Sequence, residues 1–106
     1  MISESDWKKF KKIKEEALQR FCGTILNDVS AGLENSDNST NHGKYLYLYK
    51  LIESYDKQIA LLFNDHSRSK ATIQLMMLRQ EGLVNEADIQ GLSNKLKEHT
   101  NPSNHA

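Results

Sequence analysis

Apolar residues recur at steps of three and four along the first third of the chain, from Trp7 to Leu33. This spacing puts them on one side of an α-helix, because a helix completes a turn in about 3.6 residues. Residues 3–6 (SESD) have the composition of a helix N-terminus. The pattern predicts a long first helix that begins near residue 3 or 5. It leaves open whether the helix is continuous at Gly23, whether it bends there, or whether another segment packs closely against this glycine. Gly32 is compatible with a frayed C-terminal end of the helix.

Residues 34–43 (ENSDNSTNHG) are polar throughout and predict a flexible loop. The next segment carries two conflicting signals. Residues 45–49 (YLYLY) favour a strand locally, whereas apolar residues spaced by three and four over eighteen residues favour a helix. The longer pattern prevails, so we predict a second helix from about Lys44 to Asn64. Its seam consists of Tyr45, Leu48, Ile52, Tyr55, Ile59 and Leu62.

Two shorter helices are predicted after a polar break at residues 64–67. The third helix covers about 68–81 and ends at Gly82, where Leu83 supplies the apolar contact of a glycine C-cap. The fourth begins after the acidic segment 85–88 and carries apolar residues as far as Leu96.

Residues 78–89 (LRQEGLVNEADI) resemble the helix–turn–helix hairpin of short C-terminal (SHOCT-type) domains. The shared features are a leucine before the turn, the Gly-Leu-Val turn and an acidic restart. The resemblance implies a hairpin and nothing about function.

Composition supports an all-α fold. Thirteen leucines against two valines favour helix, and five glycines with one proline are few for the many turns of a β domain. At 106 residues the chain has the size of one domain. We expect an antiparallel bundle of about four helices over residues 1–99, with two long helices and a C-terminal hairpin of two shorter ones. Residues 100–106 are expected to form a disordered tail.

Charge and cysteine content narrow the function classes. Fourteen basic and fourteen acidic side chains balance, which argues against a general polyanion binder. No apolar run suits a membrane span or a secretory signal, so we expect a cytoplasmic protein. Cys22 lies on the first stripe and is expected to be a buried, reduced thiol. No catalytic, cofactor-binding or metal-ligating constellation is found, so we expect a protein that is not an enzyme and needs no cofactor.

A polar cluster suggests one alternative function. Ser67, Arg68, Ser69 and Lys70 combine two hydroxyls and two cations at a predicted helix start, where a phosphate or carboxylate could bind. The simpler interpretation is that Ser67 caps the helix and Arg68 pairs with Asp65 or a neighbouring acid.

A basic run suggests a second alternative. Residues 7–14 (WKKFKKIK) are amphipathic and could contact nucleic acid or a membrane surface. The competing interpretation is a solvated helix face whose lysines pair with nearby acids.

The leading hypothesis rests on the second helix, which is apolar around more than half of its circumference. A domain of this size cannot readily cover such a helix on every side. We therefore expect a non-catalytic protein-interaction or adaptor module that acts as a homodimer through the seam of Tyr45, Leu48, Ile52, Tyr55, Ile59 and Leu62. A different helical protein could occupy the same surface.

Overall fold

The computed structural model describes residues 2–35 and 40–104, and within these ranges every regular element is helical. The α-helices are α1 (Glu4–Asn35), α2 (Asn41–Phe63), α3 (Ala71–Gln80), α4 (Glu86–Gln90) and α5 (Asn94–His99). Short 3-10 helices are η1 (Arg68–Lys70) and η2 (Pro102–Asn104). The all-α prediction is confirmed, whereas a bundle of about four helices is not.

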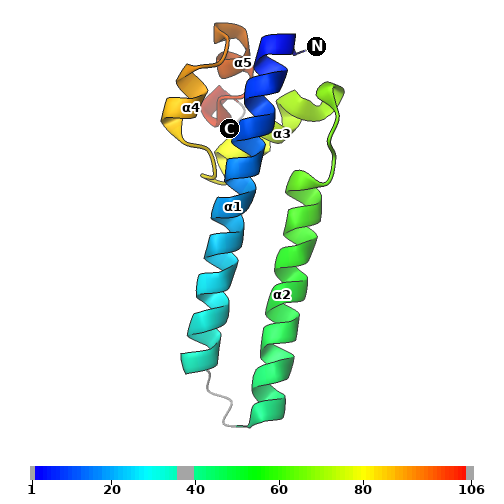
Figure 1. Ribbon diagram of the computed structural model, residues 1–106, viewed down its shortest axis with the longest axis vertical. Helices are drawn as coiled ribbons and strands as arrows, with labels where there is room; N and C mark the ends of the chain where they lie inside the picture. The colour runs from blue at the N-terminus through cyan, green and yellow to red at the C-terminus, as the bar shows by residue number, and fades with distance from the viewer. Residues whose placement is uncertain (1, 36–39, 105–106) are drawn as a thin grey trace.

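The molecule is elongated, with extents of 53 × 25 × 23 Å. Figure 1 shows α1 and α2 side by side as a long antiparallel hairpin, with α3, α4 and α5 gathered around its upper end, beside the N-terminal half of α1. We call residues 68–104 the head. We call residues 22–34 of α1 together with 41–61 of α2 the stalk.

Helix α1 is continuous through Gly23. Its first turn is capped as predicted, because the amide of Asp6 donates to Ser3 Oγ at 3.1 Å. A Cβ atom built on Gly23 would meet nothing within 4 Å, so the close neighbour considered for this residue is absent. The close approach occurs at Gly32 instead, where a Cβ would lie 2.9 Å from Tyr47 Cε1. Gly32 is a buried residue inside α1 and does not fray the helix end.

The helical prediction for the tyrosine-rich segment is confirmed by α2. This helix begins three residues earlier than expected, because Thr40 Oγ1 accepts a hydrogen bond from the amide of Gly43 at 3.0 Å and caps it. Both long helices therefore extend into the predicted loop. Residues 36–39 of that loop lie outside the described residues.

The predicted glycine C-cap of α3 is confirmed. Gly82 has φ +71°, the amide of Leu83 donates to Leu78 O at 3.0 Å, and the amide of Gly82 donates to Arg79 O at 3.1 Å. These are the two hydrogen bonds of a Schellman motif. The segment before α3 differs from the prediction, because residues 68–70 form η1 and Ser67 makes no side-chain cap hydrogen bond.

The prediction of a single fourth helix was wrong, because the chain turns at Gly91 and forms α4 and α5. The carboxylate of Asp6 accepts hydrogen bonds from the amide of Ser93, at 3.0 Å, and from its hydroxyl. Ser93 Oγ in turn accepts the amide of Leu96 at 3.3 Å and caps α5. In a continuous helix the Ser93 amide would donate to a backbone carbonyl of the preceding turn. Here it donates to Asp6 of α1 instead, so the helix is interrupted at this point.

The residues after α5 belong to the head. Thr100, which we expected in a disordered tail, is fully buried, and its hydroxyl is 2.9 Å from Arg79 Nη1. Residues 102–104 form η2, and residues 105–106 lie outside the described part of the chain.

The hydrophobic core lies where the head meets the two long helices. Its fully buried members include Phe10 and Ala17 of α1 and Leu75 and Leu78 of α3. At about 1.5 Å per residue, the 10, 5 and 6 residues of α3, α4 and α5 cannot reach along the 32 residues of α1. The stalk consequently has only two helices.

The three environments of glycine give a stability prediction. Gly23→Ala is expected to raise the free energy of unfolding by about 0.5–1 kcal/mol, because alanine favours helix and the site is open. Gly32→Ala should give a smaller gain or a loss, since Tyr47 and Leu48 must shift. Gly82→Ala should lower stability by about 1 kcal/mol or more because of its positive φ. Urea unfolding measures all three, and equal effects at Gly23 and Gly32 would contradict the packing described.

Candidate interaction surface

Large apolar side chains are exposed mainly on the stalk. Among the described residues this set comprises Leu26, Leu33, Tyr45, Leu46, Tyr47, Tyr49, Ile52 and Leu61, with Ile73 in the head. Leu26 is 67% exposed, Tyr45 63% and Ile52 49%. Single exposed apolar residues are ordinary on protein surfaces, so the question is whether these lie together.

Several of them do lie together, along one side of the stalk. A shallow groove of about 220 Å³ is lined by Cys22, Ile25 and Leu26 from α1 and by Ile52, Tyr55, Asp56 and Ile59 from α2. Residues at heptad-like steps of three and four extend this groove along both helices. We call the combined surface the apolar face: Cys22, Ile25, Leu26, Val29 and Leu33 of α1, and Tyr45, Tyr49, Ile52, Asp56 and Ile59 of α2.

The head does not cover this face. Lys9 Nζ donates to Gly91 O at 2.8 Å, and Arg20 Nη1 donates to Leu83 O at 3.0 Å, so the head packs on the side of α1 that carries these two residues. Cys22 follows Arg20 by two positions and therefore lies about 200° around the helix from it. The apolar face is open along the stalk.

The seam predicted as an interface divides between two environments. Leu62 is buried in the core, and Leu48 packs against Gly32 of α1. The Tyr55 ring contacts Phe21 edge-on, with centroids 5.8 Å apart, so much of the seam forms the contact between α1 and α2. Tyr45 and Ile52 are exposed on the apolar face, where Ile59 is half-buried.

The predicted seam did not include Leu26, Leu33 or Tyr49, which are exposed on the open face. A second register on α2, at 45, 49, 52, 56 and 59, overlaps the predicted seam and contains Asp56. Periodicity shows that both registers exist, but it does not show which one faces α1.

Polar contacts place the predicted anion-binding cluster at the junction between the head and the start of α1. Arg68 Nη1 lies 2.9 Å from Glu4 Oε2, and Arg68 Nε donates to Ile2 O at 3.0 Å. Ser67 Oγ lies 3.3 Å from Ser69 Oγ. Arg68 therefore pairs with an acid, as one interpretation expected, but that acid is Glu4 and not Asp65. Lys70 is exposed.

Several lysines of the basic run have structural contacts. Lys14 is buried, and its ammonium donates to Asp65 O at 2.8 Å. Burial lowers the pKa of Lys14, an effect that the charge of Asp65 opposes. Lys11 Nζ lies 5.5 Å from the centre of the Trp7 ring, within the range of a cation–π contact. The run thus contributes partly to folding, while Lys8 and Lys12 remain exposed.

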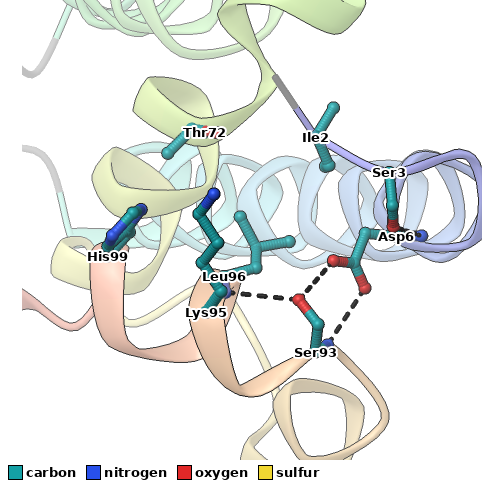
Figure 2. A pocket seen from close by; sticks show the side chains of 8 residues that line it. All are labelled: Ile2, Ser3, Asp6, Thr72, Ser93, Lys95, Leu96 and His99. Carbon is teal, nitrogen blue, oxygen red and sulfur yellow. Dashed lines mark hydrogen bonds between the residues drawn. The ribbon is translucent and has the colours of Figure 1, made fainter.

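A larger pocket of about 440 Å³ lies between α1, α3 and α5, lined by Ile2, Ser3, Asp6, Thr72, Ser93, Lys95, Leu96 and His99. Figure 2 shows the Asp6 carboxylate directed at Ser93, with both of its oxygens in hydrogen bonds. Asp6 is 5% exposed and therefore acts as a structural acceptor that ties α5 to α1.

Other site chemistry is sparse in residues 2–35 and 40–104. No group of three or more His, Cys, Asp or Glu residues there is arranged to hold a metal ion, and no helix there is long and apolar enough to cross a membrane. Comparisons with protein families, curated proteins and solved structures found no match. Within the described residues, the apolar face carries most of the exposed large apolar side chains, and it is therefore the candidate interaction surface.

The contact between Asp6 and Ser93 can be tested by substitution. Asp6→Ala should lower the free energy of unfolding by about 3 kcal/mol, because it leaves the Ser93 amide without its charged acceptor. Asp6→Asn keeps one carbonyl oxygen at this position and should lose about half as much or less. Urea unfolding compares the two, and equal losses would contradict the role assigned to the carboxylate.

A tyrosine titration tests the packing within the stalk. The Tyr55 hydroxyl donates to Asp28, and this hydrogen bond, with burial and the charge of Asp28, raises the pKa of Tyr55 above 10.0. The contribution of the bond to stability is therefore complete below pH 10.0 and is lost as the pH rises through the raised pKa.

Asp28→Asn should bring the Tyr55 transition closer to its ordinary position. The phenolate absorbance measures this transition, and subtracting the curve of Tyr55→Phe isolates it. Glu53→Gln is the matched control, because Glu53 raises the pKa of Tyr49. An unchanged Tyr55 transition in Asp28→Asn would refute the contact.

Proposed function

We propose that this protein is a non-catalytic protein-interaction module that acts as a homodimer through its apolar face. The observation that carries the proposal is the exposure of Leu26, Tyr45 and Ile52 on one continuous side of the stalk. Contiguous apolar patches on soluble proteins commonly mark interaction sites, because their burial is favoured by roughly 25 cal/mol per Å².

The geometry of the face suits a helical partner. Apolar residues at steps of three and four follow both α1 and α2, and such paired stripes pack by inserting side chains between those of facing helices. Between residues 45 and 59 the α2 stripe is about 21 Å long. A second hairpin of the same kind would complete a four-helix arrangement around it.

A second copy satisfies this requirement directly. A twofold axis in the plane of contact brings the same surface of each chain together, so both apolar faces are covered at once. The head lies on another side of α1 and stays accessible, as does Leu61, which is 74% exposed outside the face. These surfaces would let the dimer act as an adaptor for a further protein.

Substitutions on the face should separate association from folding. Ile52→Lys and Leu26→Glu are expected to convert the dimer to a monomer, because each places a charge in the centre of the contact. The free energy of unfolding of the monomer should change by no more than about 0.5 kcal/mol, since both side chains are exposed in the single chain.

Sedimentation equilibrium gives the mass of each variant, and circular dichroism reports its fold. Leu61→Lys is the matched control, because it changes an exposed apolar residue of α2 outside the face. A dimer that survives both Ile52→Lys and Leu26→Glu would show that another surface mediates the association.

A further inference from the structure

Asp56 is the charged member of the apolar face. It lies between Ile52 and Ile59 in the α2 stripe and lines the groove with Cys22 and Leu26 of α1. No hydrogen bond or ion pair to its carboxylate is present within residues 2–35 and 40–104. In the single chain, water solvates this exposed group.

Covering the face would remove Asp56 from water, and a buried carboxylate without a hydrogen-bond donor is strongly unfavourable. In a symmetric dimer the covering surface is the same face, so the donor must come from that face. Its strongest donors are the hydroxyls of Tyr45 and Tyr49, whose rings stack with centroids 6.5 Å apart. Glu53 lies one helical turn after Tyr49 and raises the pKa of Tyr49, so it competes within the chain for that hydroxyl. Tyr45 is therefore the donor better placed to serve a second chain.

The position of these residues along the stalk distinguishes two orientations. Tyr45 precedes Asp56 by eleven residues, about 16 Å along α2. If the two heads lay at the same end, α2 of each chain would lie opposite α1 of the other. Each Asp56 would then meet the part of that α1 at the same height along the stalk, where Ile25 and Leu26 offer no strong donor. If the heads lay at opposite ends, α2 would run antiparallel to its copy and residues of different levels would meet.

In that second orientation, a twofold axis midway between residues 45 and 56 brings each Tyr45 opposite the Asp56 of the other chain. This midpoint falls between Tyr49 and Ile52, close to the centre of the α2 stripe from 45 to 59. The axis that satisfies both carboxylates therefore also gives nearly complete overlap of the two apolar faces.

We propose that two copies pack with their heads at opposite ends, and that the Tyr45 hydroxyl of each copy donates a hydrogen bond to Asp56 of the other. This inference rests on the proposed function and adds the orientation of the second copy and the polar pair that sets the register. A single polar position within an apolar seam is a known way to fix the alignment of packed helices.

A double-mutant cycle on the dimer dissociation constant tests the pair. Tyr45→Phe should weaken the dimer about tenfold or more, because it leaves a carboxylate unpaired in the contact. In an Asp56→Leu background the same substitution should change the constant by less than about threefold. Tyr47→Phe is the matched control and should have no effect, since Tyr47 lies off the face.

Spin labels test the orientation independently. Lys8 is exposed on α1, four turns before Cys22 and near the same side of the helix, so a label at Lys8→Cys in a Cys22→Ala background reports the separation of the two helix starts. Opposite heads predict a distance of about 60 Å between labels, and adjacent heads predict about 20 Å.

The outcomes separate the two proposals. A chain that is monomeric at every concentration would refute the proposed function and the inference together. Two results would overturn the inference and still leave the homodimer in place. One is a dimer with the short label distance, and the other is a dimer that Tyr45→Phe weakens equally with and without Asp56.

Discussion

The structure depends on a mismatch in helix length. Two antiparallel helices can bury only the stripe that each presents to the other, and a third layer must cover what remains. Here that layer is the head, whose helices are 10 residues or shorter, while α1 has 32. The head completes a core around Phe10 and Leu75, and beyond it the stalk keeps one apolar side open.

Arg68 and Lys14, which the sequence suggested as parts of an anion site and of a nucleic-acid or membrane contact, make bonds within the chain instead. Together with Asp6 they join α1 to the head and to the link before it. Arg68 bonds to the start of α1, Lys14 to the link before η1, and Asp6 to the start of α5. These bonds connect residues more than fifty positions apart in sequence. Arg68 and Lys14 thus have partners within the chain, and we propose the apolar face as the site of function in place of an anion, nucleic-acid or membrane contact.

Local signals explain what could be predicted. Three predictions are confirmed: the long helix α1, the helical conformation of the tyrosine-rich segment in α2, and the glycine C-cap at position 82. Each of these features depends on residues that are close together in sequence. The turn at Ser93 and the burial of Thr100 depend on Asp6 and Arg79, which lie 87 and 21 positions away. Neither partner could be identified from residues 85–106 alone.

The candidate site was likewise predictable only in part. The apolar surplus of the second helix was evident from its sequence, and Tyr45 and Ile52 are members of the open face. Which register of α2 faces α1 was not evident, because the two registers overlap and differ mainly at Tyr49 and Asp56. Packing of Leu48 against the bare backbone of Gly32 selects the register that turns inward.

The central claim is that a second copy covers the apolar face, and the mass of the protein in solution tests it most directly. Light scattering on a sizing column, over a wide range of loading concentrations, should give a mass that approaches twice 12.2 kDa as concentration rises. A mass that stays at 12.2 kDa over the whole range would contradict the account.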